Sequence, residues 1–165
     1  TDAPTISTLN RFVQSLHHEH RPDRFTAPDA AALTPVVEQW LRSEHRRIWL
    51  AEDSSGSPVG YVMGVRFERP ANALVPSATV VELDQVVVDP VARGRGIATS
   101  LCEAVLQWAE EVGADRVDLS TWAFNDSARS LFARLGFTTD FLRQSRSAGE
   151  SRTTRDVQRD DDTLT

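Results

Sequence analysis

The segment VVVDPVARGRGIATSL, residues 86–101, constrains the fold of this chain more than any other stretch. Three β-branched valines favour a strand, Asp89 and Pro90 end it, and an arginine–glycine alternation leads into a segment with helical periodicity. A helix that starts directly after glycines leaves its first backbone N–H groups without partners, and the helix dipole adds positive potential there. Such a strand–turn–helix unit is suited to bind phosphate through its main chain.

Two glycines and two arginines form the turn itself. Gly94 and Gly96 let a ligand approach the main chain without a Cβ in the way, and Arg93 and Arg95 add charged donors. The turn alone is equally compatible with two solvated arginines on a glycine-assisted bend. Two known phosphate loops are excluded: the chain has no lysine for a Walker loop, and Thr99 stands where a Rossmann fingerprint needs its third glycine.

Hydrophobic periodicity divides the rest of the chain into helices and strands. Two helices are expected over residues 2–20 and 97–112. A third is expected to start at a Thr34 cap, with Pro35 at the first helical position, and a fourth to run from an Asn125 or Asp126 cap to Gly136. Strands are expected over residues 47–53, 59–67, 79–88, 116–122 and 138–144. This order predicts one α/β domain with a mixed sheet and helices on both of its faces.

Length and charge narrow the class of protein. At 165 residues the chain suits one domain, expected over residues 1–145, followed by a polar tail over 146–165 that is predicted to be disordered apart from a weak strand around 153–158. The single cysteine, Cys102, excludes an internal disulfide and favours a cytoplasmic location. The net charge of −6 argues against nucleic acid as the main partner, and no apolar run approaches the roughly 20 residues of a membrane helix. An acidic body fits a cationic substrate, and a merely soluble surface explains the charge equally well.

The strand predicted over residues 79–88 carries two carboxylates among apolar residues. Glu82 and Asp84 are two residues apart and therefore lie on the same face of the strand. Burial and mutual repulsion raise the pKa of at least one of such a pair, which suits a general base. The alternative is structural pairing of an acid with an arginine such as Arg66.

Two blocks of sequence carry a family resemblance. The first block is a pattern of Gln or Arg, two residues of any type, Gly, one residue of any type, and then Gly or Ala. Arg93, Gly96 and Ala98 match this pattern. The second block is matched in order by Asn125, Ala128, Leu131, Phe132, Gly136 and Phe137. Over residues 2–142 the chain thus resembles the GNAT superfamily of acyl-CoA-dependent N-acyltransferases. The resemblance implies a mostly antiparallel central sheet flanked by helices, and the family's short first strand is expected to be missing through truncation.

The resemblance also implies a function and a cofactor site. The function is transfer of an acetyl group from acetyl-CoA to a primary amine, by direct attack in a ternary complex. The main chain of Val86, Val87 and Val88 would pair with the pantetheine arm. Asn125, Ala128 and Phe132 would meet the cofactor from the following helix. The pyrophosphate would be held by the backbone amides of Arg93, Gly94, Arg95, Gly96, Ile97, Ala98 and Thr99.

Proton transfer is the chemical difficulty of this reaction. An alkylammonium with a pKa of about 10.4 is neutral in less than about one part in a thousand at pH 7, so a base that removes its proton lowers the barrier. In the family a catalytic glutamate often lies eleven residues before the signature, which is Glu82 here, with Asp84 as second base or cation-binding partner. Phe132 stands where many relatives have a tyrosine acid, so the proton for the leaving thiolate comes from water or from the ammonium-like intermediate.

The acceptor is predicted only as a class. In the family the first two helices often wall its pocket, which makes Glu19, His20, Asp23 and Phe25 candidates for substrate contact. The neighbouring histidines also fit a metal site, but a solvated or substrate-facing helix end is the preferred interpretation, and no metal is expected. The predicted acceptor is a small cationic molecule. The alternatives are a protein or peptide amine and a non-catalytic acyl-CoA-binding regulatory module, and a homodimer is a further option.

Overall fold

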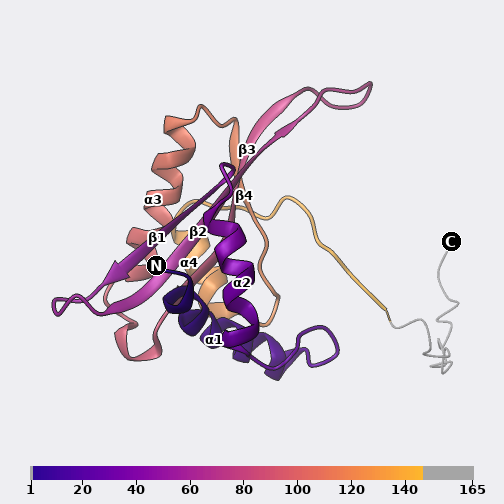
Figure 1. Ribbon diagram of the computed structural model, residues 1–165. Helices are drawn as coiled ribbons and strands as arrows, with labels where there is room; N and C mark the ends of the chain where they lie inside the picture. Colours follow the sequence, from indigo (N-terminus) through magenta and orange to yellow (C-terminus); the bar gives the residue numbers. More distant parts are fainter. Residues whose placement is uncertain (1, 147–165) are drawn as a thin grey trace, which may run out of the picture.

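Four strands form one sheet in the order β1-β2-β3-β4 in the computed structural model, which describes residues 2–146 (Figure 1). The strands are β1 (Arg46–Glu52), β2 (Pro58–Arg69), β3 (Ala78–Val88) and β4 (Arg116–Leu119). The first three are antiparallel to one another, and β4 runs parallel to β3. The prediction of a mixed, mostly antiparallel sheet is confirmed.

Helices cover both faces of this sheet, as predicted. They are α1 (Ala3–His20), α2 (Ala30–Leu41), the short 3₁₀ helix η1 (Pro90–Ala92), α3 (Ile97–Glu111) and α4 (Asp126–Arg134). Figure 1 shows α1 and α2 on the side of the sheet opposite α3. One apolar cluster joins α3 and α4 to the sheet, and a second joins α1 and α2 to it. Within the part of the chain that the structure describes, no helix is both long and apolar enough to cross a bilayer.

The start of α2 differs from the sequence prediction. The prediction that Thr34 caps this helix is wrong: Asp29 is the cap, because its carboxylate accepts a hydrogen bond from the backbone N–H of Ala32 at 3.0 Å. The alanines that follow Asp29 favour a helix, so the helix begins one turn earlier. Pro35 therefore lies inside α2, where it lacks the N–H of one backbone hydrogen bond.

The sheet also ends earlier than predicted. β4 stops at Leu119 rather than continuing to residue 122, because its ladder with β3 covers only Val80 to Leu83. The strand predicted over residues 138–144 is wrong. That segment pairs with no described strand, and Phe141 and Leu142 are 79% and 81% exposed, so alternation of apolar residues did not produce a ladder there. The weak strand predicted around 153–158 lies outside the described residues.

A β-bulge in β3 determines which side chains face which layer of helices. Met63 of β2 pairs with Gln85 and Gly64 pairs with Leu83, so Asp84 is an extra residue in the ladder. Leu83 packs in the cluster of α3, and after the bulge Val86 does so too. Gly64 is required opposite the bulge, because a Cβ there would lie 2.8 Å from the ring of Trp108.

Candidate functional site

The turn between β3 and α3 has the backbone geometry that its glycines predict. Gly94 and Gly96 adopt left-handed conformations, with φ of 76° and 80°, and a Cβ on either would meet no atom within 4 Å. The chain enters the turn through η1, whose cap Asp89 accepts a hydrogen bond from the N–H of Val91. These glycines are therefore needed for conformation, and the space beside them is open.

The amides of this turn lack protein partners. The first hydrogen bond of α3 runs from the N–H of Ser100 to the carbonyl of Gly96, at 3.0 Å. Six consecutive amides, from Gly94 to Thr99, have no acceptor among residues 2–146. The amide of Arg93, which was also predicted to hold the pyrophosphate, is not free, because it donates to the carbonyl of Pro90 at 3.4 Å. Within the described part of the chain, no side chain caps α3 either. The amino end of a 15-residue helix thus presents free donors at its positive pole, which suits an anion such as a diphosphate.

Beside this turn, one edge of β3 has no partner among the strands of the described residues. On one side β3 pairs with β2 as far as Val88, whereas on the other side the ladder with β4 ends at Leu83. Val86 and Val88 are half-buried against the cluster of α3. The segment from Asp84 to Val88 can therefore accept an extended ligand along its free edge, which is the arrangement expected for a pantetheine arm.

The two arginines of the turn have different surroundings. The Nε of Arg93 donates to the carbonyl of Val88 at 3.3 Å, which ties this side chain back to β3. Arg95 instead lines a cavity of about 460 Å³ next to the turn. The other residues that line this cavity are Asp53, Ser54, Val59, Val91, Ala92 and Ile97.

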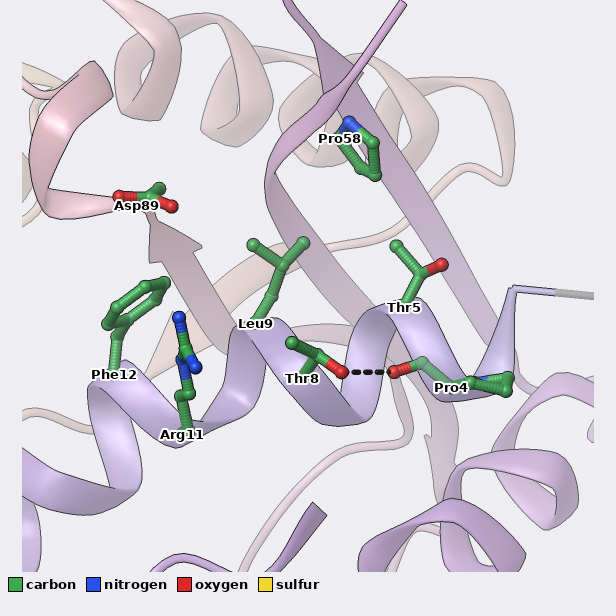
Figure 2. A pocket seen from close by; sticks show the side chains of 8 residues that line it. All are labelled: Pro4, Thr5, Thr8, Leu9, Arg11, Phe12, Pro58 and Asp89. Carbon is green, nitrogen blue, oxygen red and sulfur yellow. Dashed lines mark hydrogen bonds between the residues drawn. The ribbon is translucent and has the colours of Figure 1, made fainter. Parts of the chain in front are cut away.

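A second groove, of about 330 Å³, lies where α1 passes the ends of β2 and β3 (Figure 2). Leu9 and Phe12 rise from α1 toward Pro58 and Asp89 in this view. The remaining lining residues are Pro4, Thr5, Thr8 and Arg11. The groove borders the end of β3 on the layer of α1 and α2.

The carboxylates predicted on β3 lie together on the face that α1 and α2 cover. Burial raises the pKa of Glu82, and repulsion from Asp84 and from Asp118 of the adjacent β4 raises it further, while Arg46 lowers it. Burial also raises the pKa of Asp84, against the lowering effect of Arg46. The ion partner is therefore Arg46, whose Nη1 lies 3.8 Å from Asp84, whereas Arg66 pairs with Glu68.

A hydrogen-bonded ring that the sequence analysis missed joins α1 to β2 and β3. The Nδ2 of Asn10 donates to Tyr61 at 2.8 Å and to the Oε1 of Gln85 at 3.1 Å. The hydroxyl of Tyr61 donates to the same Oε1 at 2.6 Å. Tyr61 is fully buried, and burial raises the pKa of its hydroxyl far above the ordinary value. The only available signal was a polar residue on the apolar face of a predicted helix.

The acceptor candidates near the end of α1 separate into two groups. The imidazole of His20 stacks on Phe124 at 4.3 Å, and Phe25 lies edge-on to Trp122 at 5.4 Å. Asp23 instead pairs with Arg21 at 2.7 Å, and Glu19 is exposed. His17, which was not among the candidates, contacts Phe25, Trp122 and Phe124, and burial lowers the pKa of its imidazole.

Three further predicted residues lie on α4. Asn125 caps the helix by accepting a hydrogen bond from the N–H of Ala128 at 3.2 Å, which settles the choice between Asn125 and Asp126 as the cap. Ala128 is half-buried against the cluster of α3. Phe132 is 7% exposed, and its ring lies 5.9 Å from that of Phe137. Its assignment to the cofactor stays a prediction.

The described residues offer neither a metal site nor a reactive cysteine. Among residues 2–146, no three His, Cys, Asp or Glu side chains are close enough to hold a metal ion. Cys102 is fully buried, and burial raises the pKa of its thiol to about 11. A protonated, buried thiol is a poor nucleophile.

Comparison with known proteins places this chain in a family. The model of the acetyltransferase (GNAT) family matches residues 13–137. The chain belongs to this family, as its two sequence blocks predicted.

Curated relatives match over part of their length. An uncharacterized N-acetyltransferase of Methanocaldococcus jannaschii is 29% identical over 99 residues, which cover 60% of this chain and 42% of that protein. A mycothiol acetyltransferase of Pseudarthrobacter chlorophenolicus is 30% identical over 128 residues, which cover 76% of this chain and 37% of that protein. The chain thus spans less than half of the length of these relatives.

Solved structures share the fold. The BH1408 protein of Bacillus halodurans, as a tetramutant, superposes with a TM-score of 0.84 at 18% identity, covering 88% of this chain and 94% of that one. The aminoglycoside N-acetyltransferase AAC(6')-Iy, solved in complex with CoA, gives a TM-score of 0.61 at 23% identity, covering 86% and 90%. The predicted GNAT-like fold is therefore confirmed.

Proposed function

We propose that this protein transfers the acetyl group of acetyl-CoA to a primary amine of a small molecule, with Glu82 as general base. The observation that carries the proposal is the order of features along β3. Its carboxyl end has a free edge and leads to unpaired amides, and its middle holds two carboxylates with raised pKa values. A diphosphate-bearing thioester and an amine would thus meet on one strand.

The residues at the carboxyl end of β3 fit the cofactor. The free amides from Gly94 to Thr99 would hold the diphosphate, and the edge of Val86 to Val88 would pair with the pantetheine amides. Arg95 adds a cation beside the turn. When bound, acetyl-CoA supplies an acetyl thioester that is reactive toward an amine nitrogen. The chain's part is to fix that group against the carboxylates.

Glu82 is the better placed of the two carboxylates to remove a proton. It is half-buried on the α1 and α2 face and is flanked by Asp84 and Asp118. Its raised pKa brings it closer to the operating pH of the reaction, which improves a general base. Asp84, held near Arg46, remains to attract the ammonium form of the acceptor.

The proton for the departing thiolate does not come from a tyrosine. Phe132 has no proton to give, and Tyr61 is buried in its ring of hydrogen bonds with a pKa raised far above neutral. In this proposal the thiolate takes its proton from water or from the acceptor nitrogen itself.

The names of relatives favour a small acceptor. One matched group is named for mycothiol and one solved neighbour for aminoglycosides, and both are small molecules. Charge supports a cationic one, because the protein carries a net charge of −6 and Glu82, Asp84 and Asp118 share one face of the sheet.

The test separates cofactor binding from turnover. Calorimetry with acetyl-CoA is expected to show binding, and a saturating concentration of about 100 times Kd stabilises the fold by about 2.7 kcal/mol. Acetyl-pantetheine, which has the thioester but lacks the diphosphate, is the matched ligand and is expected to bind at least tenfold more weakly. Thiol release is then followed with aminoglycosides, polyamines, amino acids and peptides.

Each outcome has a defined meaning. Equal affinity for the two thioesters would show that the turn does not bind the diphosphate. Binding without thiol release across the whole panel would show that the protein is a non-catalytic acyl-CoA-binding module and not an enzyme. Release with peptides alone would replace the small acceptor with a polypeptide.

A further inference from the structure

The ring of Asn10, Tyr61 and Gln85 is a buried hydrogen-bond network that has no role in the proposed reaction as described above. Its three hydrogen bonds measure 2.6–3.1 Å, and Asn10 and Tyr61 are 8% and 0% exposed. Gln85 is half-buried, so part of its side chain remains accessible although its Oε1 is held by the ring. A buried ring of this kind holds its members in one orientation.

Gln85 lies at the junction of the two halves of the site. It follows Asp84 directly and precedes Val86, so the carboxylates are on one side of it and the free edge of β3 on the other. The bulge places Asp84 and Gln85 on the same face, toward α1 and α2.

Helix α1 covers this junction. It contacts β3 through Asn10 and reaches the segment after β4 through His17, which packs on Trp122. The two contacts are seven residues apart, which is about 10 Å along a helix. α1 thus bridges the free edge of β3 at the level of Gln85.

The hydrogen bonds fix which end of the carboxamide is free. Oε1 of Gln85 already accepts from both Asn10 and Tyr61. Its Nε2 has no acceptor among residues 2–146. A neutral N–H donor cannot bind an ammonium, which has no lone pair, but it binds an oxygen that gains negative charge.

We infer that Gln85 is a further catalytic residue, whose Nε2 donates to the carbonyl oxygen of the acyl thioester, and that Asn10 and Tyr61 are positioning residues. The inference rests on the proposed function. As the amine nitrogen bonds to the carbonyl carbon, the π electron pair moves to the oxygen that Gln85 faces. It returns as the C–S bond breaks and the thiolate leaves with the bonding pair. Of the two protons that the ammonium nitrogen loses, the first passes to Glu82 before the attack, and the second passes to the thiolate, directly or through water.

Kinetics of three variants test the inference. Gln85→Met keeps the length of the side chain and removes its donor, and we expect kcat to fall about 100-fold, with the Kd of acetyl-CoA unchanged within twofold. Tyr61→Phe removes one clamp, and we expect a fall of about fivefold in kcat. Ser7→Ala is the control: it removes another buried hydroxyl of α1, one that donates to the carbonyl of Ala3, and leaves kcat unchanged.

Gln85→Glu adds a readout that packing alone would not move. A carboxylate cannot donate, whereas a carboxylic acid can. We expect its residual activity, relative to that of the wild type, to rise as the pH falls. A Gln85→Met protein with kcat within twofold of the wild type, or a Gln85→Glu protein with an unchanged pH profile, would overturn the inference while leaving acetyl transfer intact.

The single tyrosine of the chain offers a readout that needs no turnover. Tyrosine labelled with ¹³C at Cζ gives one resonance, which reports the hydrogen bond from Tyr61 to Gln85. We expect acetyl-CoA to shift it more than CoA, which lacks the acyl oxygen, and we expect this difference to vanish in Gln85→Met. Equal shifts with both ligands would overturn the inference, even for a protein with no turnover. Failure of acetyl-CoA to bind the wild type would overturn both proposals.

Discussion

The two ends of the proposed site are built from different parts of the chain. The turn after β3 offers backbone amides, which are fixed by two left-handed glycines and a helix terminus. The middle of β3 offers side chains, and Glu82, Asp84 and Gln85 depend on Arg46, Asp118 and Asn10 from three other elements. The main-chain end needs only local geometry, whereas the side-chain end needs the whole fold.

This difference has an electrostatic consequence. Backbone amides do not titrate, so the main-chain end should bind its ligand almost equally well across neutral pH. The side-chain end titrates, because burial and neighbouring carboxylates raise the pKa values of Glu82 and Asp84. Variants at the two ends should therefore separate binding from proton transfer.

The largest expected effect is at the side-chain end. Glu82→Gln should lower kcat about 100-fold or more at pH 7, because general bases contribute roughly that much. The Kd of acetyl-CoA should stay unchanged. The wild-type rate should rise with pH as Glu82 ionises, through a raised pKa, and the variant should lose this rise. Glu68→Gln, on a surface ion pair, is the control. Full activity in Glu82→Gln would assign the proton to another group.

The same variant has a predicted effect on stability. Because the folded-state pKa of Glu82 is raised, the folded protein binds the proton more tightly than the unfolded chain. The stability that Glu82 contributes is then fully present below the ordinary glutamate pKa and is lost as the pH rises through the raised value. Thermal unfolding between pH 4 and pH 8 should show a smaller decline in Glu82→Gln.

The next effect is at the main-chain end. Gly96→Ala forces alanine into a left-handed conformation, which costs about 1–2 kcal/mol, and places a methyl group beside the free amides. We expect the affinity for acetyl-CoA to fall about tenfold. Gly56→Ala is a closely matched control, since Gly56 has φ of 79° and open space but lies in the β1–β2 hairpin. Equal losses of affinity in both variants would show that backbone strain, and not the amide site, is responsible.

A smaller effect tests the cofactor role of Asn125. Both Asn125 and Asp29 cap helices by accepting from a backbone N–H, at 3.2 and 3.0 Å. Replacing either with alanine should lower the free energy of unfolding by about 1 kcal/mol. Only Asn125→Ala should also weaken acetyl-CoA binding, by about threefold. Calorimetry and thermal melts of the two variants give both quantities, and equal affinities would confine Asn125 to capping.

The smallest effect concerns Arg46. Its guanidinium lowers the pKa values of both Glu82 and Asp84, so Arg46→Gln should raise both. The rising limb of the rate profile should move to higher pH, and the rate at pH 6 should fall about twofold. Arg66→Gln is the control: it breaks only the ion pair with Glu68, and the pH–rate profile should stay unchanged. A shift in both variants would point to general surface charge.

The main-chain end was predictable from the sequence and the side-chain end only in part. Gly94, Gly96 and the helix after them form one continuous stretch, so local rules give their conformation. Glu82 and Asp84 were found from their spacing, but their partner Arg46 lies 38 residues away from Asp84 and reaches it only through the pairing of β1 with β2.

Two errors have different origins. Asp29 was missed as the cap of α2 because Pro35, a good first helical residue, gave a competing start. The strand predicted over residues 138–144 had suitable alternation, but whether an edge accepts a strand depends on tertiary structure. The ring of Asn10, Tyr61 and Gln85 joins positions up to 75 residues apart, which no local pattern reveals.

The extra residue in β3 gives this strand an unusual density of functional groups. A regular strand presents one side chain to a given face about every 6.8 Å, so two neighbours in sequence never serve the same face. With one residue inserted, Glu82, Asp84 and Gln85 all reach the layer of α1, while Leu83 and Val86 still anchor the opposite side. Removing Asp84 should restore regular alternation and leave every other side chain on its present face. Removing Glu82 instead should turn Leu83 out of the apolar cluster and Asp84 into it, so the tolerance of β3 to single-residue deletions should be confined to the position of the bulge.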